Sequence, residues 1–105
     1  MPFFLVRYTY TDDTAGRDHH RAEHKTYLAA AADRGLILGS GPFAAGEDPG
    51  AAMIYEAAGR QDVVDVVEGD PFHVQGYVAS YDVTEWIPMI GPWAADAQIR
   101  VSQRA

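Results

Sequence analysis

The chain has 105 residues, enough for one domain around one hydrophobic core and too few for two. It contains no cysteine, which excludes disulfides, thiolate catalysis and cysteine-ligated metal centres. The formal net charge of −7 argues against nucleic acid and anionic membranes as partners, because phosphate binding needs clustered lysine and arginine. The sequence shows no signal-peptide pattern and no apolar run of spanning length, so we expect a protein of the cytoplasm.

The first half of the chain predicts a strand, a helix and a second strand. Residues 2–11 alternate between two sets of side chains and are rich in β-forming types, which is the pattern of a strand. The oxygen-bearing cluster at residues 12–14 is typical of a helix start. This helix should extend to about residue 34, where Gly35 accepts the left-handed conformation that ends a helix. Residues 36–43 form the second strand, although its Gly-Ser-Gly-Pro run interrupts regular pairing.

The second half predicts a strand, a short helix and a last strand. Residues 51–57 follow a turn-rich loop and form the third strand. Residues 59–69 form a helix, because their valines recur at helical spacing between two strands. The Asp70-Pro71 pair ends this helix, since a residue before proline avoids the α region. Residues 78–87 alternate again and form the fourth strand, and residues 88–105 are an irregular tail.

The resulting order, β-α-β-β-α-β, is that of the α+β ferredoxin-like fold, an antiparallel sheet with both helices on one face. We therefore expect one domain over residues 1–87 and a tail over residues 88–105. The other sheet face also carries apolar residues, so a second copy of the sheet is expected to cover it in a homodimer. The tail should pack on its own domain or on the partner subunit, because it contains several large apolar side chains. These are Ile90, Trp93, Ile99 and Val101.

The first predicted helix carries three of the four histidines, His19, His20 and His24. His20 and His24 are four residues apart and share a face that continues with Leu28, so His24 should lean toward the sheet. The cations Arg17, Arg21, Lys25 and Arg34 are expected to mark more polar directions. A histidine on an apolar face is either a satisfied core residue or a general acid/base in a partly desolvated pocket, and the pattern leaves both open.

The stretch from His20 to His24 also matches the H-x-x-E-H pattern of inverted zinc metalloproteases. We reject that interpretation, because such a site needs a third ligand from a much larger scaffold. A two-histidine metal site on this helix stays open, but no metal and no cofactor is predicted.

Two further segments are candidates for the same site. Asp70 is expected to cap a helix that begins at Pro71 and, in addition or instead, to orient a histidine by accepting its other ring N–H. The bare backbone of residues 39–42 is either a strand end with a glycine bulge or a place where a ligand approaches closely. The predicted ligand-binding residues are Ser40, Gly41, Pro42 and, on the first strand, Arg7.

Several short motifs stand in the order and spacing of one protein family. They are Glu23-His24 followed by Leu28, the run from Arg34 to Phe43, and Asp70-Pro71-Phe72 ahead of a strand that ends in Glu85-Trp86. Over residues 1 to about 87 the chain thus resembles the YciI-like, or YCII-related, proteins. It departs from them in carrying Lys25 where leucine commonly follows the histidine, and in its longer tail.

The resemblance implies a ferredoxin-like fold, dimers that join two sheets into an α+β barrel, and a catalytic pair of His24 and Asp70. A related member is similar to muconolactone-type enzymes and eliminates chloride from a chlorinated aromatic breakdown intermediate. We therefore expect a lyase or isomerase without a cofactor, acting on a small organic metabolite, with Asp70 orienting His24. The alternatives are a domain that binds a small molecule without turnover and a module that serves only dimerisation.

Overall fold

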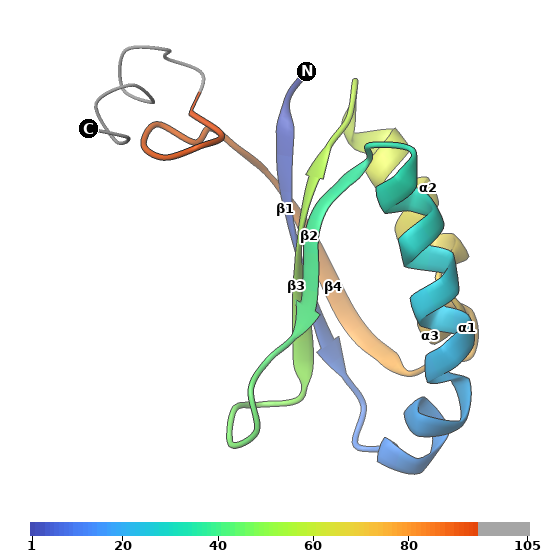
Figure 1. Cartoon of the computed structure of the whole chain (residues 1–105). Helices are drawn as coiled ribbons and strands as arrows, with labels where there is room; N and C mark the ends of the chain where they lie inside the picture. Colours follow the sequence, from blue (N-terminus) through green and yellow to red (C-terminus); the bar gives the residue numbers. More distant parts are fainter. Residues whose placement is uncertain (95–105) are drawn as a thin grey trace.

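The structure is a computed structural model and describes residues 1–94 of the chain (Figure 1). Within this part the elements are β1 (Phe3–Tyr10), α1 (Thr14–Asp33), β2 (Ile37–Pro42), β3 (Gly50–Glu56), α2 (Arg60–Gly69), α3 (Pro71–Val74) and β4 (Val78–Trp86). Every strand and helix expected from the sequence is present. The short helix α3 begins at Pro71, as expected if Asp70 is its cap. None of the helices in residues 1–94 is long and apolar enough to cross a membrane.

The four strands form one antiparallel sheet in the order β2-β3-β1-β4. The central strand β1 pairs on both sides, so that Val6 lies opposite Met53 of β3 and Val83 of β4. Figure 1 shows the helices of residues 1–94 together on one side of the sheet. The expected α+β ferredoxin-like fold is thereby confirmed.

The hydrophobic core lies between the sheet and the helices. Alternate residues of β1 point into it, and Phe4, Val6 and Tyr8 are almost completely buried. The helices add Leu28 and Ala31 from α1 and Val63, Val66 and Val67 from α2. Full burial of a large apolar side chain stabilises a fold by about 1.5–3 kcal/mol. This core therefore fixes the distance between α1 and the sheet, which is where the cavity described below lies.

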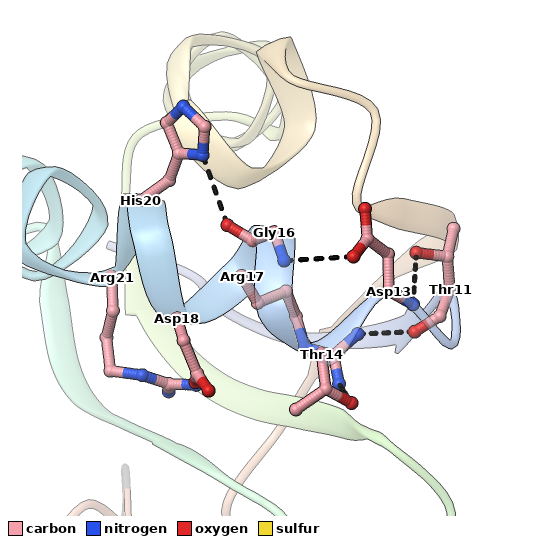
Figure 2. Close-up of polar contacts among 8 residues, drawn as sticks. All are labelled: Thr11, Asp13, Thr14, Gly16, Arg17, Asp18, His20 and Arg21. Carbon is pink, nitrogen blue, oxygen red and sulfur yellow. Dashed lines mark hydrogen bonds and ion pairs between the residues drawn. The ribbon is translucent and has the colours of Figure 1, made fainter.

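Both ends of α1 have the local signals that the sequence predicts. At its start, Asp13 Oδ1 accepts a hydrogen bond of 2.9 Å from the backbone N–H of Gly16 (Figure 2). At its end, Gly35 has φ +80°, a conformation that costs other residues a clash at Cβ. This turn leads α1 directly into β2, so the helix and the edge strand form two neighbouring walls.

The expectation that Arg17 marks a polar direction is wrong, because its side chain is only 6% exposed. Its guanidinium donates hydrogen bonds to the carbonyl oxygen of Thr11 and to Thr14 Oγ1, contacts that Figure 2 shows around the helix start. It also lies 4.8 Å from the centre of the Tyr10 ring, over its face. A weakly hydrated guanidinium tolerates such burial when its donors and its flat face are both used.

The described part of the tail, residues 88–94, contacts its own domain. The Trp93 ring meets the Trp86 ring edge to face, with 6.4 Å between their centres, and Ala94 is buried. Ile90 of the same segment is exposed. The prediction for Ile99 and Val101 concerns residues outside the described part of the chain.

Candidate active site

Asp70 stands at the junction of α2 and α3, where its backbone is extended between two helical segments. Its Oδ1 accepts a hydrogen bond of 3.0 Å from the backbone N–H of Phe72, so it caps α3. Pro71 occupies the first position of α3, which suits a residue without an N–H. The Asp70 side chain is nonetheless completely buried, which is rare for a carboxylate that only caps a helix.

The same carboxylate pairs with His24 from the middle of α1. Nδ1 of His24 lies 2.7 Å from Asp70 Oδ1. The His24 ring also stacks on the Phe72 ring, with centres 3.9 Å apart and planes inclined by 5°. The two roles considered for Asp70, helix cap and histidine partner, are therefore filled together. Because the carboxylate accepts at Nδ1, the lone pair of the imidazole is left on Nε2.

A third donor completes the environment of Asp70. The Tyr8 hydroxyl on β1 donates a hydrogen bond of 2.9 Å to Asp70 Oδ2. Three donors from β1, α1 and α3 thus meet one buried carboxylate, which as an ionised group can only accept. Such charge-assisted hydrogen bonds are stronger than neutral ones and hold the acceptor in one orientation. The Asp70 carboxylate is in turn a fixed support for the His24 ring.

Burial and the charge of Asp70 act together on the tyrosines around this carboxylate. Burial, and then the neighbouring Asp70 carboxylate, raise the pKa of Tyr8 well above the usual range. The same two causes raise the pKa of Tyr10 to about 12, against the opposing effect of Arg17 and Arg21. Both phenols are therefore neutral hydroxyls at physiological pH, and each can donate a hydrogen bond.

A cavity of about 450 Å³ lies beside His24, between α1 and the edge strand β2. Its volume is in the range of sites that hold small molecules. The α1 wall comprises Arg21, His24, Lys25, Leu28, Ala29 and Ala32; the β2 wall comprises residues 37–42; and Tyr10, Ala51 and Met53 complete it. His24 lines the cavity and keeps 14% of its side chain exposed, whereas its partner Asp70 is sealed behind it.

The structure brings most of the predicted site residues to this cavity. Ser40, Gly41 and Pro42 line it together with His24. Ser40 lies opposite Met53 in the sheet register, so its side chain is on the helix-covered face. The strand also has an irregularity between Ile37 and Gly39, as expected of a glycine bulge.

Arg7 is the predicted ligand-binding residue that the structure does not bring to the cavity. It lies opposite Ala52 and Asp82 in the register, on the open face of the sheet. Its guanidinium is 6.0 Å from the centre of the Phe43 ring. A role for Arg7 in this site therefore stays a prediction without support from its position in a single chain.

Sequence reasoning missed Tyr8, Tyr10 and two cations at this site. Arg21 and Lys25 are more exposed than His24, as expected, and they also line the cavity with it. For Tyr8 one signal was available, because a buried tyrosine hydroxyl usually finds a hydrogen-bond partner. For Arg21 and Lys25 the signal was their spacing of four residues, which places both on one face of the helix beside His24.

The other histidines of α1 have different surroundings. Nδ1 of His20 lies 3.1 Å from the Gly16 carbonyl oxygen (Figure 2) and 3.1 Å from the Tyr77 hydroxyl oxygen. His19 is exposed. Within residues 1–94, no three histidine, aspartate or glutamate side chains gather in a way that could hold a metal ion.

The sequence model of the YCII-related domain matches residues 1–87. The chain belongs to the YCII-related family. Among solved structures it is similar to 5-chloro-2-hydroxyhydroquinone dehydrochlorinase (TftG) from Burkholderia phenoliruptrix AC1100, described in complex with 2,5-dihydroxybenzoquinone. That match has 28% identity and a TM-score of 0.70, and covers 80% of this chain and 92% of the dehydrochlorinase.

A second similar structure is the protein Atu4242 from Agrobacterium tumefaciens. It is 11% identical, with a TM-score of 0.55, and the match covers 84% of this chain and 93% of Atu4242. At that identity the likeness concerns the fold alone. No protein of curated function matches the chain. The family model over residues 1–87 thus agrees with the fold that the structure shows.

Proposed function

We propose that this YCII-related protein is a cofactor-independent enzyme of the lyase or isomerase type that acts on a small organic molecule. One observation supports this most. His24 is held at Nδ1 by a sealed carboxylate, Asp70, at 2.7 Å, and the histidine ring lines a cavity of small-molecule size. A histidine oriented in this way by a carboxylate is suited to general acid/base catalysis.

In the proposed reaction, Nε2 of His24 takes a proton from a carbon next to a carbonyl group. The electron pair of the broken C–H bond then moves toward the carbonyl oxygen, or it expels a leaving group such as chloride. Asp70 stabilises the imidazolium that forms, and His24 returns the proton to a different atom in an isomerisation. No change of oxidation state is required, so the reaction needs no redox partner.

Other groups of the cavity suit the same chemistry. The neutral hydroxyl of Tyr10 and the hydroxyl of Ser40 can each donate a hydrogen bond to the carbonyl oxygen as negative charge develops on it. The bare backbone at Gly39 and Gly41 lets a ligand approach β2 closely. The dehydrochlorinase TftG is similar in fold and sequence, and the removal of hydrogen chloride in its name is a reaction of this class.

A purely structural role for the pair is less well supported. If His24 and Asp70 only held α1 to α3, the histidine would have no reason to line a cavity and keep part of its ring accessible. A domain that binds a small molecule without turnover would use the same cavity. The two possibilities differ in whether a substrate is converted, and this is what the experiment has to measure.

The experiment measures proton exchange and elimination with the purified full chain. Deuterium incorporation from deuterium oxide into a panel of small carbonyl compounds reports proton abstraction, and chloride release from 5-chloro-2-hydroxyhydroquinone reports elimination. We expect His24→Gln to lower either rate by about 10²–10⁴-fold. His20→Gln is the matched control, because His20 is on the same helix but does not line the cavity.

Equal rates in the two variants would contradict the role of His24. Ligand binding without exchange or elimination across the panel would instead support the binding-domain alternative.

We also propose that the protein is a homodimer of the cytoplasm. The open sheet face carries Phe3, Leu5 and Ile54, which are only half-buried in the single chain, and Trp86, which is exposed. A contiguous apolar surface of this kind on a soluble protein is usually covered by a partner. For the compartment, the support is the absence of cysteine from the chain.

A further inference from the structure

The charge of the cavity differs from the charge of the whole chain. The chain has 15 acidic and 8 basic residues, so a cavity placed at random would more often be lined by carboxylates. The described residues that line this cavity include two permanent cations, Arg21 and Lys25, and no aspartate or glutamate. The nearest buried carboxylate of the site, Asp70, is separated from the cavity by His24. The lining is therefore locally positive on a protein that is negative overall.

The two cations share a face of α1 to one side of the proposed base. Arg21 is three residues before His24, and Lys25 follows it directly, so that Arg21 and Lys25 are about one helical turn apart. Lys25 forms no ion pair within residues 1–94. Arg21 forms one, with its Nη2 2.7 Å from Asp18 Oδ1 (Figure 2), and its remaining N–H groups are available to a ligand.

The rest of the lining is neutral and largely apolar. Leu28, Ile37 and Met53 exclude water from one side, and the hydroxyls of Tyr10 and Ser40 are neutral donors. An ion pair next to apolar walls is stronger than one in bulk water, because the local dielectric constant is lower. Lys25 is exposed and the Arg21 side chain is 40% exposed, so both cations can meet an anionic group at the mouth of the cavity while the remainder of the molecule lies against the apolar wall.

We propose that the substrate of this site is a small organic anion, whose carboxylate or comparable acid group binds between Arg21 and Lys25 while its reacting carbon faces Nε2 of His24. This substrate class builds on the function proposed above for His24. It adds a requirement of its own, which is that charge and not shape alone selects the ligand. The two cations bind and position the substrate, and they take no part in the transfer of the proton.

The test compares two probes of nearly equal shape that differ in charge, benzoate and benzamide. Their dissociation constants are measured with the full chain at low ionic strength by NMR titration. We expect benzoate to bind about tenfold more tightly than benzamide, the difference typical of a charge-assisted hydrogen bond. Lys25→Met and Arg21→Met should each remove most of this preference, and Lys25→Arg should retain it. Raising the salt concentration should weaken benzoate binding alone.

Arg34→Met is the matched control, because it removes the same charge at the end of the same helix and Arg34 does not line this cavity. Its preference for benzoate should equal that of the unmodified protein. Equal affinity for the two probes, no benzoate binding, or an equal effect of Arg34→Met would each overturn the proposal.

Binding and turnover can fail separately. His24→Gln should keep the preference for benzoate, because anion binding does not depend on the base. A preference for benzoate with no turnover of any compound would overturn the catalytic role and support the anion site. Turnover restricted to uncharged substrates would overturn the anion site and leave the role of His24 in place.

Discussion

At Asp70 one carboxylate accepts from three donors that come from β1, α1 and α3. Removing the donors of a buried acceptor lowers the free energy of unfolding by more than the hydrogen bonds had raised it, because the acceptor cannot bind water instead. The position of His24 therefore depends on residues that never touch the cavity. Tyr8 is the clearest of these, because its hydroxyl binds the carboxylate oxygen opposite the one that holds the histidine.

The first prediction concerns the charge of Asp70. In Asp70→Asn the amide oxygen can still accept from the Phe72 N–H, so α3 keeps its cap and the fold should be retained. The negative charge that stabilises the imidazolium of His24 is lost, and any exchange or elimination rate should fall by about 10²-fold or more. The ring signals of His24, followed by NMR over a range of pH, should change at the same time. Unchanged His24 signals would leave Asp70 with the capping role alone.

The second prediction compares two buried tyrosines on the same sheet face. Tyr8→Phe removes the hydroxyl that donates to Asp70 Oδ2 and should destabilise the fold by about 1–3 kcal/mol, because this buried oxygen is left without that hydrogen bond. Tyr55→Phe removes a buried hydroxyl that has no hydrogen-bond partner within residues 1–94, so it should be neutral or stabilising. Urea unfolding measures both. A cost for Tyr55→Phe as large as that for Tyr8→Phe would show that loss of a hydroxyl, and not loss of this hydrogen bond, is what matters.

At the scale of the elements, local signals predicted the fold well. The spacing of Val63, Val66 and Val67 indicated a helix while the β propensity of valine allowed a strand, and the place of this segment between two strands correctly favoured α2. Gly35 was assigned to the end of α1, where its positive φ is now seen. These features depend on neighbours in the sequence, so a single chain carries enough information to predict them.

The site was only half predictable, because its contacts are long-range. The alternation of β1 places Tyr8 in the core, but it cannot say that the acceptor lies 62 residues away at Asp70. The polar character of Arg21 and Lys25 correctly suggested exposure, but it could not show that the gap between α1 and the edge strand β2 makes them line a cavity. The burial of Arg17 was not predicted for a related reason: its guanidinium is stabilised by the Tyr10 ring and by oxygens at the helix start, contacts that its residue type alone does not indicate.

The third prediction concerns the turn between α1 and β2, which joins the two main walls of the cavity. Gly35→Ala should destabilise the fold by about 1 kcal/mol, because its φ of +80° is unfavourable for a residue with a Cβ. The cost should come from the backbone alone, since an added Cβ would contact nothing within 4 Å. Gly35→Asn is the control and should cost less, because asparagine tolerates this conformation. Equal urea midpoints for Ala and Asn would contradict the explanation.

For the whole molecule, the buried tyrosines determine the response to alkaline pH. A phenol whose pKa is raised by folding stabilises the folded state fully below its unfolded value, near pH 10, and this contribution is lost as pH rises through the folded value. Tyr10 has a folded pKa of about 12, and burial raises the pKa of Tyr8 and Tyr55 further above the usual range. The free energy of unfolding should therefore fall steadily above pH 10.

The fourth prediction follows from this linkage. In an alkaline titration followed by ultraviolet absorbance of tyrosinate, the buried phenols should ionise only when the chain unfolds, in one step with the loss of helical circular dichroism. Smooth ionisation of all six tyrosines before any loss of helix would contradict the burial of Tyr8 and Tyr55.

The last prediction concerns the open face of the sheet. In the single chain, Leu5 of β1 lies opposite Ile54 of β3, and Phe3 packs edge to face against Trp86 of β4. These side chains form one apolar surface on the side of the sheet that faces away from the helices of residues 1–94 (Figure 1). A second copy would bury this surface on both subunits at once, by a self-complementary contact between two sheets.

Light scattering after size exclusion at micromolar concentration should therefore give twice the 11.5 kDa mass of one chain. Leu5→Glu places a charge in the middle of the proposed contact, where it would be buried without a partner, and should shift the mass toward that of one chain. Val74→Glu is the control, because Val74 is equally apolar and 63% exposed but belongs to α3 on the helix side. The control should keep the mass of the unmodified protein. A single-chain mass for the unmodified protein would rule out the dimer, and an equal shift in both variants would place the contact elsewhere than on the open sheet face.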